Sequence, residues 1–209
     1  MFTALDHDKL NSLIDCIKFF ASKGWTPATS TNYSFRSSQF DQFIISRSGV
    51  DKTLVQKEDF LIIDIEGKIL KSQKLDAKSS AETEIHTEIY RRFPDAHCVL
   101  HTHSILGTIL SHAFAQEKKI VFQDLEILKG LEGNVTHEMS ETLPIVPNSQ
   151  NISEINAAMA PHYEGPIKIH GFLIAGHGLY TWGRDIASAK RHIETFEFLL
   201  DCFYHLRRL

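Results

Sequence analysis

The sequence predicts an α/β fold: one domain with a central, mostly antiparallel β-sheet flanked by helices. Three observations support this prediction. Strand-like and helix-like segments alternate along the 209 residues, one strand pair carries a hairpin signal, and the sequence contains no repeats, low-complexity segments or Pro/Gly-rich linkers. The hairpin argues against a purely parallel sheet, and the even composition favours a single domain over residues 1–209.

The amino-terminal part of the chain predicts a helix followed by a strand hairpin. Residues 6–22 repeat apolar side chains at helical spacing, and Gly24 follows as a stop signal. Residues 43–49 and 60–70 are strand-like, and Glu66-Gly67 is a suitable hairpin turn within the second segment.

The rest of the chain alternates between predicted strands and helices. In order these are a helix at 79–92, a strand at 98–103, a short helix from Ser104, a strand at 119–122, a helix at 124–131, strands in LPIVP and IKIHGFLIAGHGLYTW, and a helix at 185–206. Apolar residues of the last helix are spaced 3,4,3,4,3, which is typical of a helix packed on a core.

The composition excludes several classes of partner. Lys and Arg number 22 against 26 Asp and Glu, for a net charge of −4, which gives no support to a nucleic-acid or membrane-surface partner. The first residues lack a signal-peptide pattern, and no apolar run approaches the roughly 18 residues of a membrane span. Three widely spaced cysteines without a CxxC motif indicate reduced thiols, as in a cytoplasmic protein.

The strand at 98–103 ends in a His-x-His motif, His101 and His103. Residues i and i+2 of a strand point to the same face, so two imidazoles in this spacing form half of a metal site. The alternative is that each ring hydrogen-bonds a buried carbonyl. His177 is the best third ligand because glycines flank it and leave its imidazole uncrowded, although it could also be an incidental turn residue.

The other histidines lack this framing. His86, His192 and His205 fall in predicted helices, where we expect ordinary surface or boundary residues. Three neutral imidazoles at His101, His103 and His177 would leave a fourth coordination position open, as catalytic zinc sites do.

Two carboxylates are candidates for acid–base work beside such an ion. Glu82 precedes the His-x-His strand by about one helix, but Ser79-x-x-Glu82 also has the spacing of a helix capping box. Glu126 lies one turn into the predicted helix at 124–131, where a lone glutamate is usually a solvated surface residue. Asp124 in the same helix is equally suited to be an N-cap, and periodicity does not choose among these groups.

Three polar stretches have the composition of phosphate-binding loops: ATSTNYS, SRSGVDK and KSS. Hydroxyls, loop N–H groups and a helix N-terminus together suit a phosphate monoester. Each stretch alone is also a common turn, so the interpretation depends on whether they share one pocket. GxxxxGK[ST] and GxGxxG motifs are absent from the sequence, so nucleotide-binding folds are unsupported.

Five stretches in this order resemble the class II (zinc-dependent) aldolase family: GWTPATSTNYSFR, SRSGVDK, KSSAETEIH, AHCVLHTHS and GFLIAGHGLYTWG. They span residues 24–183. The resemblance implies a class II aldolase-like fold, one Zn²⁺ per subunit held by His101, His103 and His177, and a phosphorylated sugar substrate. It also implies a homotetramer with active sites near the subunit interfaces.

Shorter matches, LEILKG among them, are similar to a branch of this family that dehydrates a phosphorylated, methylthio-bearing ketose in methionine salvage. By this resemblance Glu126 takes the place of the branch's acid–base glutamate, and Glu82 that of the aldolases' catalytic glutamate. The phosphate pocket would draw on five residues. They are Thr31, Asn32, Ser48, Gly49 and Ser80.

Two departures from the family pattern concern the phosphate pocket. The family commonly carries glycine at Thr31, and Lys-Pro-Ser where this chain has KSS, with Ala81 in place of a further serine. Two alternatives to the dehydratase remain. One is an aldolase or epimerase of another sugar phosphate that uses Glu82 as its base, and the other is a non-catalytic scaffold stabilised by zinc.

Overall fold

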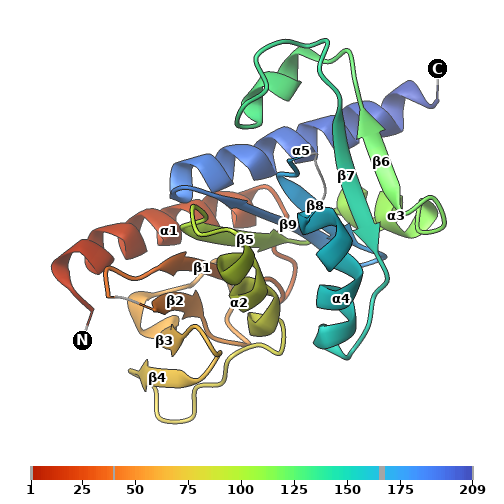
Figure 1. Ribbon diagram of the computed structural model, residues 1–209. Coiled ribbons are helices and arrows are strands. Elements are labelled where there is room, and N and C mark those ends of the chain that lie inside the picture. The colour runs from red at the N-terminus through yellow and green to blue at the C-terminus, as the bar shows by residue number, and fades with distance from the viewer. Residues whose placement is uncertain (1, 40, 165–167, 209) are drawn as a thin grey trace.

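The computed structural model describes residues 2–39, 41–164 and 168–208. Its nine strands form one sheet in the order β4-β3-β2-β1-β5-β9-β8-β7-β6, in which every neighbouring pair is antiparallel except β7 and β8 (Figure 1). The strands are β1 Tyr33–Arg36, β2 Gln42–Ser46, β3 Phe60–Asp64, β4 Ile69–Ser72, β5 Cys98–Thr102, β6 Lys119–Phe122, β7 Glu141–Val146, β8 Gly171–Ile174 and β9 Gly178–Gly183. The predicted fold class is confirmed.

Helices cover both faces of this sheet (Figure 1). The helices are α1 Ala4–Ser22, α2 Thr83–Arg92, α3 Ile105–Ala113, α4 Ile152–Tyr163 and α5 Ile186–Leu206, with 3-10 turns η1 Lys57–Asp59 and η2 Glu126–Gly130. α1 and α5 share one buried cluster, and α2 and α4 share the other. None of the helices in the described ranges is long and apolar enough to cross a membrane.

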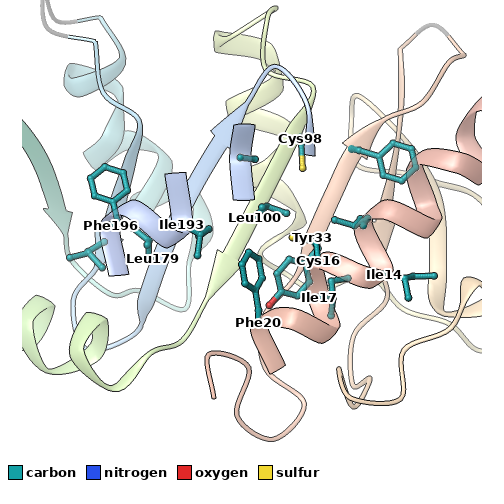
Figure 2. Close-up of a cluster of buried hydrophobic side chains, with 14 of the residues drawn as sticks. Ile14, Cys16, Ile17, Phe20, Tyr33, Cys98, Leu100, Leu179, Ile193 and Phe196 are labelled. Atoms are coloured by element: carbon teal, nitrogen blue, oxygen red, sulfur yellow. The ribbon is translucent and has the colours of Figure 1, made fainter. Parts of the chain in front are cut away.

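Alternate residues of the central strands supply the two clusters. Leu100 of β5 and Leu179 of β9 face α1 and α5, where they pack with Phe20, Ile193 and Phe196 (Figure 2). Val99 and Tyr180, their neighbours in sequence, face α2 and α4. Because side chains alternate along a strand, the same strand end can present different chemistry to each face.

Several predicted elements need correction at their boundaries. The hairpin is present, with β3 and β4 joined through Glu66-Gly67. The helix expected at 79–92 begins only at Thr83, and the helix expected at 124–131 is the short turn η2 instead. The segment IKIHGFLIAGHGLYTW forms β8 and β9, and its first residue, 167, lies outside the described residues.

Two elements were missed by the sequence analysis. Strand β1 is only four residues long and was treated as part of a polar loop. Helix α4 contains Pro161 in its last turn and buries only Ile155 and Met159. Both segments have too few apolar repeats to be assigned from periodicity.

Candidate metal and active site

Three histidines converge at the end of β5 and at the turn between β8 and β9. Metal-ligating nitrogens of His101, His103 and His177 all lie within 4.8 Å of one another. The Nε2 atoms of His101 and His103 are 2.8 Å apart, and both rings meet the His177 ring edge to face. The sheet therefore brings His101 at the end of β5 and His103 just after it together with a third histidine that follows them by 74 positions or more.

His101 is held rigidly in this cluster. Its ring is fully buried and stacks on Tyr180 with centroids 3.9 Å apart. Its Nδ1–H donates to the carbonyl of Leu179 at 2.9 Å, so the lone pair of the neutral ring lies on Nε2, facing the other histidines. A carbonyl partner of this kind fixes the tautomer of metal-binding histidines.

His177 depends on the glycines beside it. Gly176 has a φ of +64°, a conformation that glycine adopts without strain. A Cβ on Gly178 would lie 2.3 Å from the carbonyl oxygen of Thr102 and 2.9 Å from the His101 ring, so only glycine fits there. The hydroxyl of Thr108 in α3 donates to the His177 carbonyl at 3.0 Å and fixes the turn.

The protonation states of the cluster suit a cation. Burial lowers the pKa of His101 well below its ordinary value and lowers that of His103 to about 4, so both rings are neutral at pH 7. Neutral imidazoles are the ligands that Zn²⁺ takes in catalytic sites, and three of them leave one position open. The donor set therefore fits a zinc ion, although imidazole alone does not distinguish zinc from iron, nickel or copper.

Glu82 lies against the histidines rather than in a capping box. Its Oε1 is 3.0 Å from His177 Nε2 and 3.8 Å from His101 Nε2, and its Oε2 accepts a hydrogen bond from Asn32. Glu82 is itself the N-cap residue of α2 and its side chain makes no capping bond, so the capping-box interpretation is wrong.

The neighbours of Glu82 keep its carboxylate ionised. Burial raises the pKa of this group, but the rings of His101 and His177 and the hydrogen bonds from His177 and Asn32 outweigh burial and hold the pKa well below its ordinary value. Glu82 is therefore an ionised carboxylate beside the histidine cluster, where it can accept hydrogen bonds.

Glu126 lies apart from the histidines of its own chain. It is in η2, within the green excursion between β6 and β7 at the top of Figure 1, and its side chain is 70% exposed. Its polar contacts among the described residues are an ion pair with Lys129 and a longer one with His137. The chain thus brings Glu82 to the histidines and leaves Glu126 on the surface.

The three polar stretches pack against one another. Asn32 of the first bonds Glu82, next to Ser80 of the third, and the Ser80 hydroxyl accepts from the Glu82 backbone N–H at 3.2 Å. The N–H of Ser48 in the second stretch donates to the Lys78 carbonyl of the third at 2.9 Å. The stretches therefore lie together beside the histidine cluster.

Two of the expected phosphate-binding residues have left-handed backbone conformations. Gly49 has a φ of +73°, and Thr31 has the same value. This conformation favours glycine, which the family commonly carries at the position of Thr31. The chain keeps the loop geometry at a cost of about 1–2 kcal/mol for a residue with a Cβ.

Lys52 is a charged residue of this region that the sequence analysis did not select. It is 1% exposed, and its Nζ donates to the carbonyls of Val50 at 3.0 Å and Thr29 at 3.5 Å, which joins the first two stretches. Burial lowers its pKa to about 8. Its position in the SGVDK motif was the available signal, since buried lysines are rare without an anionic partner.

Two histidines expected at the surface are buried instead, which corrects that interpretation. His86 in α2 is fully buried and bonds Asn32 and Ser34. His192 in α5 is 2% exposed and bonds the backbone of Trp182 and Glu132. His205 is exposed, as expected. Helical periodicity did not show that α2 and α5 turn these positions inward.

The chain belongs to the class II aldolase family. Residues 11–204 match the family described as class II aldolase and adducin N-terminal domain. Methylthioribulose-1-phosphate dehydratase of Stenotrophomonas maltophilia (strain K279a) is 42% identical over 197 residues, which cover 94% of this chain and 90% of that one. The protein of the same name from Picosynechococcus sp. (strain ATCC 27264 / PCC 7002 / PR-6) is 46% identical over 187 residues, covering 89% and 86%.

A solved structure shares the fold at lower identity. L-fuculose-1-phosphate aldolase from Thermus thermophilus superposes with a TM-score of 0.72 at 23% identity, covering 96% of both chains. The family expected from the sequence motifs is therefore confirmed.

Proposed function

We propose that this protein is a lyase that dehydrates 5-methylthioribulose 1-phosphate to 5-methylthio-2,3-diketopentyl 1-phosphate, a step of methionine salvage. The observation that carries the proposal is the site itself: three clustered histidines with Glu82 bonded among them, beside three packed polar loops. Relatives named methylthioribulose-1-phosphate dehydratase, which are similar to this chain over most of their length, support the choice of substrate.

We propose His101, His103 and His177 as the ligands of one Zn²⁺ per subunit. When bound, zinc polarises the substrate's C2 carbonyl and a neighbouring hydroxyl, which makes the C3 proton acidic. Thr31, Asn32, Ser48, Gly49 and Ser80 are the proposed phosphate-binding residues, and the buried ammonium of Lys52 adds positive charge next to them. Binding the phosphate at one end fixes which carbon faces the carboxylates.

The two carboxylates take different parts in the proposed mechanism. Glu82 is held ionised against the histidines and orients the substrate hydroxyls by accepting hydrogen bonds. Glu126 removes the C3 proton and then returns a proton to the C4 hydroxyl, which leaves as water; the resulting enol loses its C3 hydroxyl proton and gains one at C4 to become the 2,3-diketone.

Glu126 is exposed and does not contact the three clustered histidines of its own chain. We therefore propose that the Glu126 acting at each site comes from a neighbouring copy of the chain. A homotetramer whose sites lie at the subunit interfaces would place this residue beside the ion of the next subunit. The proposed compartment is the cytoplasm, where free thiols such as the three cysteines of this chain persist.

An activity assay tests the proposal. Zinc-loaded protein should convert 5-methylthioribulose 1-phosphate to the diketone, followed by ¹H NMR. Glu126→Gln should lose activity, and mixing it with an inactive His101→Ala variant should restore part of it, because mixed tetramers pair an intact Glu126 with an intact histidine cluster. Absence of product from the zinc-loaded protein would overturn the function, and absence of restoration in the mixture would overturn the shared site.

One observation favours a second candidate, an aldolase or epimerase of another sugar phosphate. Glu82 contacts the histidines within the chain, as expected of a base that acts alone. In that case Glu126→Gln would retain full activity on the true substrate, while Glu82→Gln would abolish it.

A further inference from the structure

A buried chain of polar side chains leads from Glu82 into the interior between β1 and α2. Asn32 Nδ2 donates to Glu82 Oε2, and Asn32 Oδ1 contacts His86 Nε2. The other nitrogen of this ring, Nδ1, is 2.7 Å from Ser34 Oγ, which is 2.7 Å from the hydroxyl of Tyr90. The four residues behind Glu82 are each at most 2% exposed, so water does not satisfy them.

The direction of every bond in this chain follows from its end at a carboxylate. Glu82 only accepts, so the Asn32 amide must turn its NH₂ group toward it and its oxygen toward His86. His86 therefore carries its proton on Nε2, and its Nδ1 accepts from the Ser34 hydroxyl. Ser34 in turn accepts from Tyr90, which leaves all four donors pointing toward Glu82.

The far end of the chain is anchored. The Arg36 guanidinium lies 4.7 Å from the centre of the Tyr90 ring, and its Nε donates to the Ala96 carbonyl at 2.8 Å. Hydrogen bonds aligned in one direction polarise each other, and a fully satisfied buried network is rigid. The position of Glu82 Oε2 is therefore fixed through His86 by groups that lie far from solvent.

We infer that His86 is a positioning residue for the proposed dehydration: as a neutral Nε2–H imidazole it locks the Asn32 amide, which holds Glu82 Oε2 and leaves Oε1 directed at His177 and His101. Burial also keeps the His86 ring neutral, since it lowers the pKa to about 3. A ring protonated at both nitrogens would have no acceptor for Ser34, and the chain of bonds would reverse or break.

His192 is a matched control for His86. It is also a buried helical histidine with both ring nitrogens bonded, but its partners are the backbone of Trp182 and Glu132, and it has no link to Glu82. His86→Phe and His192→Phe therefore remove comparable buried hydrogen bonds, and only the first removes the support of Asn32.

The activity readout rests on the proposed function. We expect His86→Phe to lower kcat about 10- to 100-fold, the range for groups that orient metal-site residues, with KM changed less than about threefold. His192→Phe should lower the melting temperature to a similar degree with kcat within about twofold of wild type.

In a Glu82→Gln background, adding His86→Phe should lower kcat by less than about threefold, because the group that His86 positions is already changed. A full further loss in that background, or an equal kcat loss in His192→Phe, would overturn the assignment.

A measurement without substrate tests the same inference. In ¹⁵N-histidine NMR spectra of the whole protein, the His86 resonances are those that disappear in the His86→Gln variant. They should show the neutral Nε2–H tautomer between pH 6 and 8. An Nδ1–H or doubly protonated His86 would overturn the inference. If His86 shows the expected tautomer but the protein does not dehydrate 5-methylthioribulose 1-phosphate, only the proposed function is overturned. His86→Gln, which keeps one donor and one acceptor, also serves the kinetic test if His86→Phe does not fold, with a smaller kcat loss expected.

Discussion

A half-buried glutamate, Glu82, and a buried one, Glu197, lie against opposite faces of β5, and their surroundings shift the pKa values of their carboxyl groups in opposite directions. Glu82 faces His101 on the α2 side, and its pKa is held well below the ordinary value. Glu197 of α5 faces Thr102 on the other side, where burial raises its pKa to about 7 against weaker hydrogen bonds from Ser104 and Thr102. Adjacent residues of β5, His101 and Thr102, thus contact one carboxyl group that is ionised at pH 7 and one that keeps part of its protons there.

The comparison shows that burial does not decide the charge of a carboxyl group. Burial alone raises the pKa of both groups, and only Glu82 has imidazoles and an amide donor that outweigh it. The hydrogen bonds from the Ser104 and Thr102 hydroxyls lower the pKa of Glu197 by less than burial raises it. We therefore assign metal chemistry to the histidine face and a structural role to the Glu197 face.

The largest expected effect is on the histidine face. His101→Ala should lower zinc affinity more than a hundredfold, beyond the 10- to 100-fold typical of groups that only orient ligands, and should abolish dehydration. Metal analysis and isothermal titration would measure this, with His205→Ala, an exposed histidine of α5, as the control. Stoichiometric zinc in purified His101→Ala would contradict the assignment.

Replacing Glu82 or Glu197 by glutamine tests whether only one face of β5 contributes to activity. Glu82→Gln should lower kcat about 10- to 100-fold, the range for groups that orient the reacting partners at a metal site. Glu197→Gln should keep kcat within about threefold of wild type. Steady-state kinetics of both variants at pH 7 would show comparable losses if the two faces were not distinct.

The same pair predicts a difference in stability with pH. The native state keeps the Glu197 proton up to about pH 7, whereas the unfolded chain loses it near the ordinary value of 4.5, so this group makes the folding free energy less favourable as pH rises through that window. Glu197→Gln should therefore gain up to about 3 kcal/mol relative to wild type between pH 5 and 7.5.

Urea unfolding of wild type and Glu197→Gln at several pH values measures this gain. The difference between the two proteins is the informative quantity, because histidines with a lowered pKa, such as His103 and His192, make the folded state more stable as pH rises, in wild type and variant alike. A difference that stays constant with pH would show that Glu197 ionises normally.

The smallest expected effect concerns the loop next to Asn32. Thr31→Gly should raise the free energy of unfolding by about 1 kcal/mol, because glycine adopts a φ of +73° without strain. Thr31→Ala keeps a Cβ in the same conformation and should give no such gain. Equal unfolding midpoints for Gly and Ala variants would argue against strain at this position.

The sequence was sufficient to predict what depends on local pattern. The long helices α1 and α5 follow from apolar spacing, and His101 and His103 follow from strand alternation. The roles of Glu82 and His86 were not accessible in this way, because their environments are set by Asn32 and Ser34. These two residues lie some 50 positions earlier, at the start of a strand too short to predict. The resemblance to a known family selected Glu82 and Glu126, but only the fold shows that they lie in different places.

We propose that the histidine face of β5 binds the catalytic metal. Anomalous diffraction at the zinc edge, on crystals of the zinc-loaded protein, tests it most directly. We predict one anomalous peak per subunit, about 2.0–2.1 Å from one nitrogen of each of His101, His103 and His177. A peak elsewhere, for example beside His170 and His192, with none between these three histidines, would show that these histidines do not bind the metal.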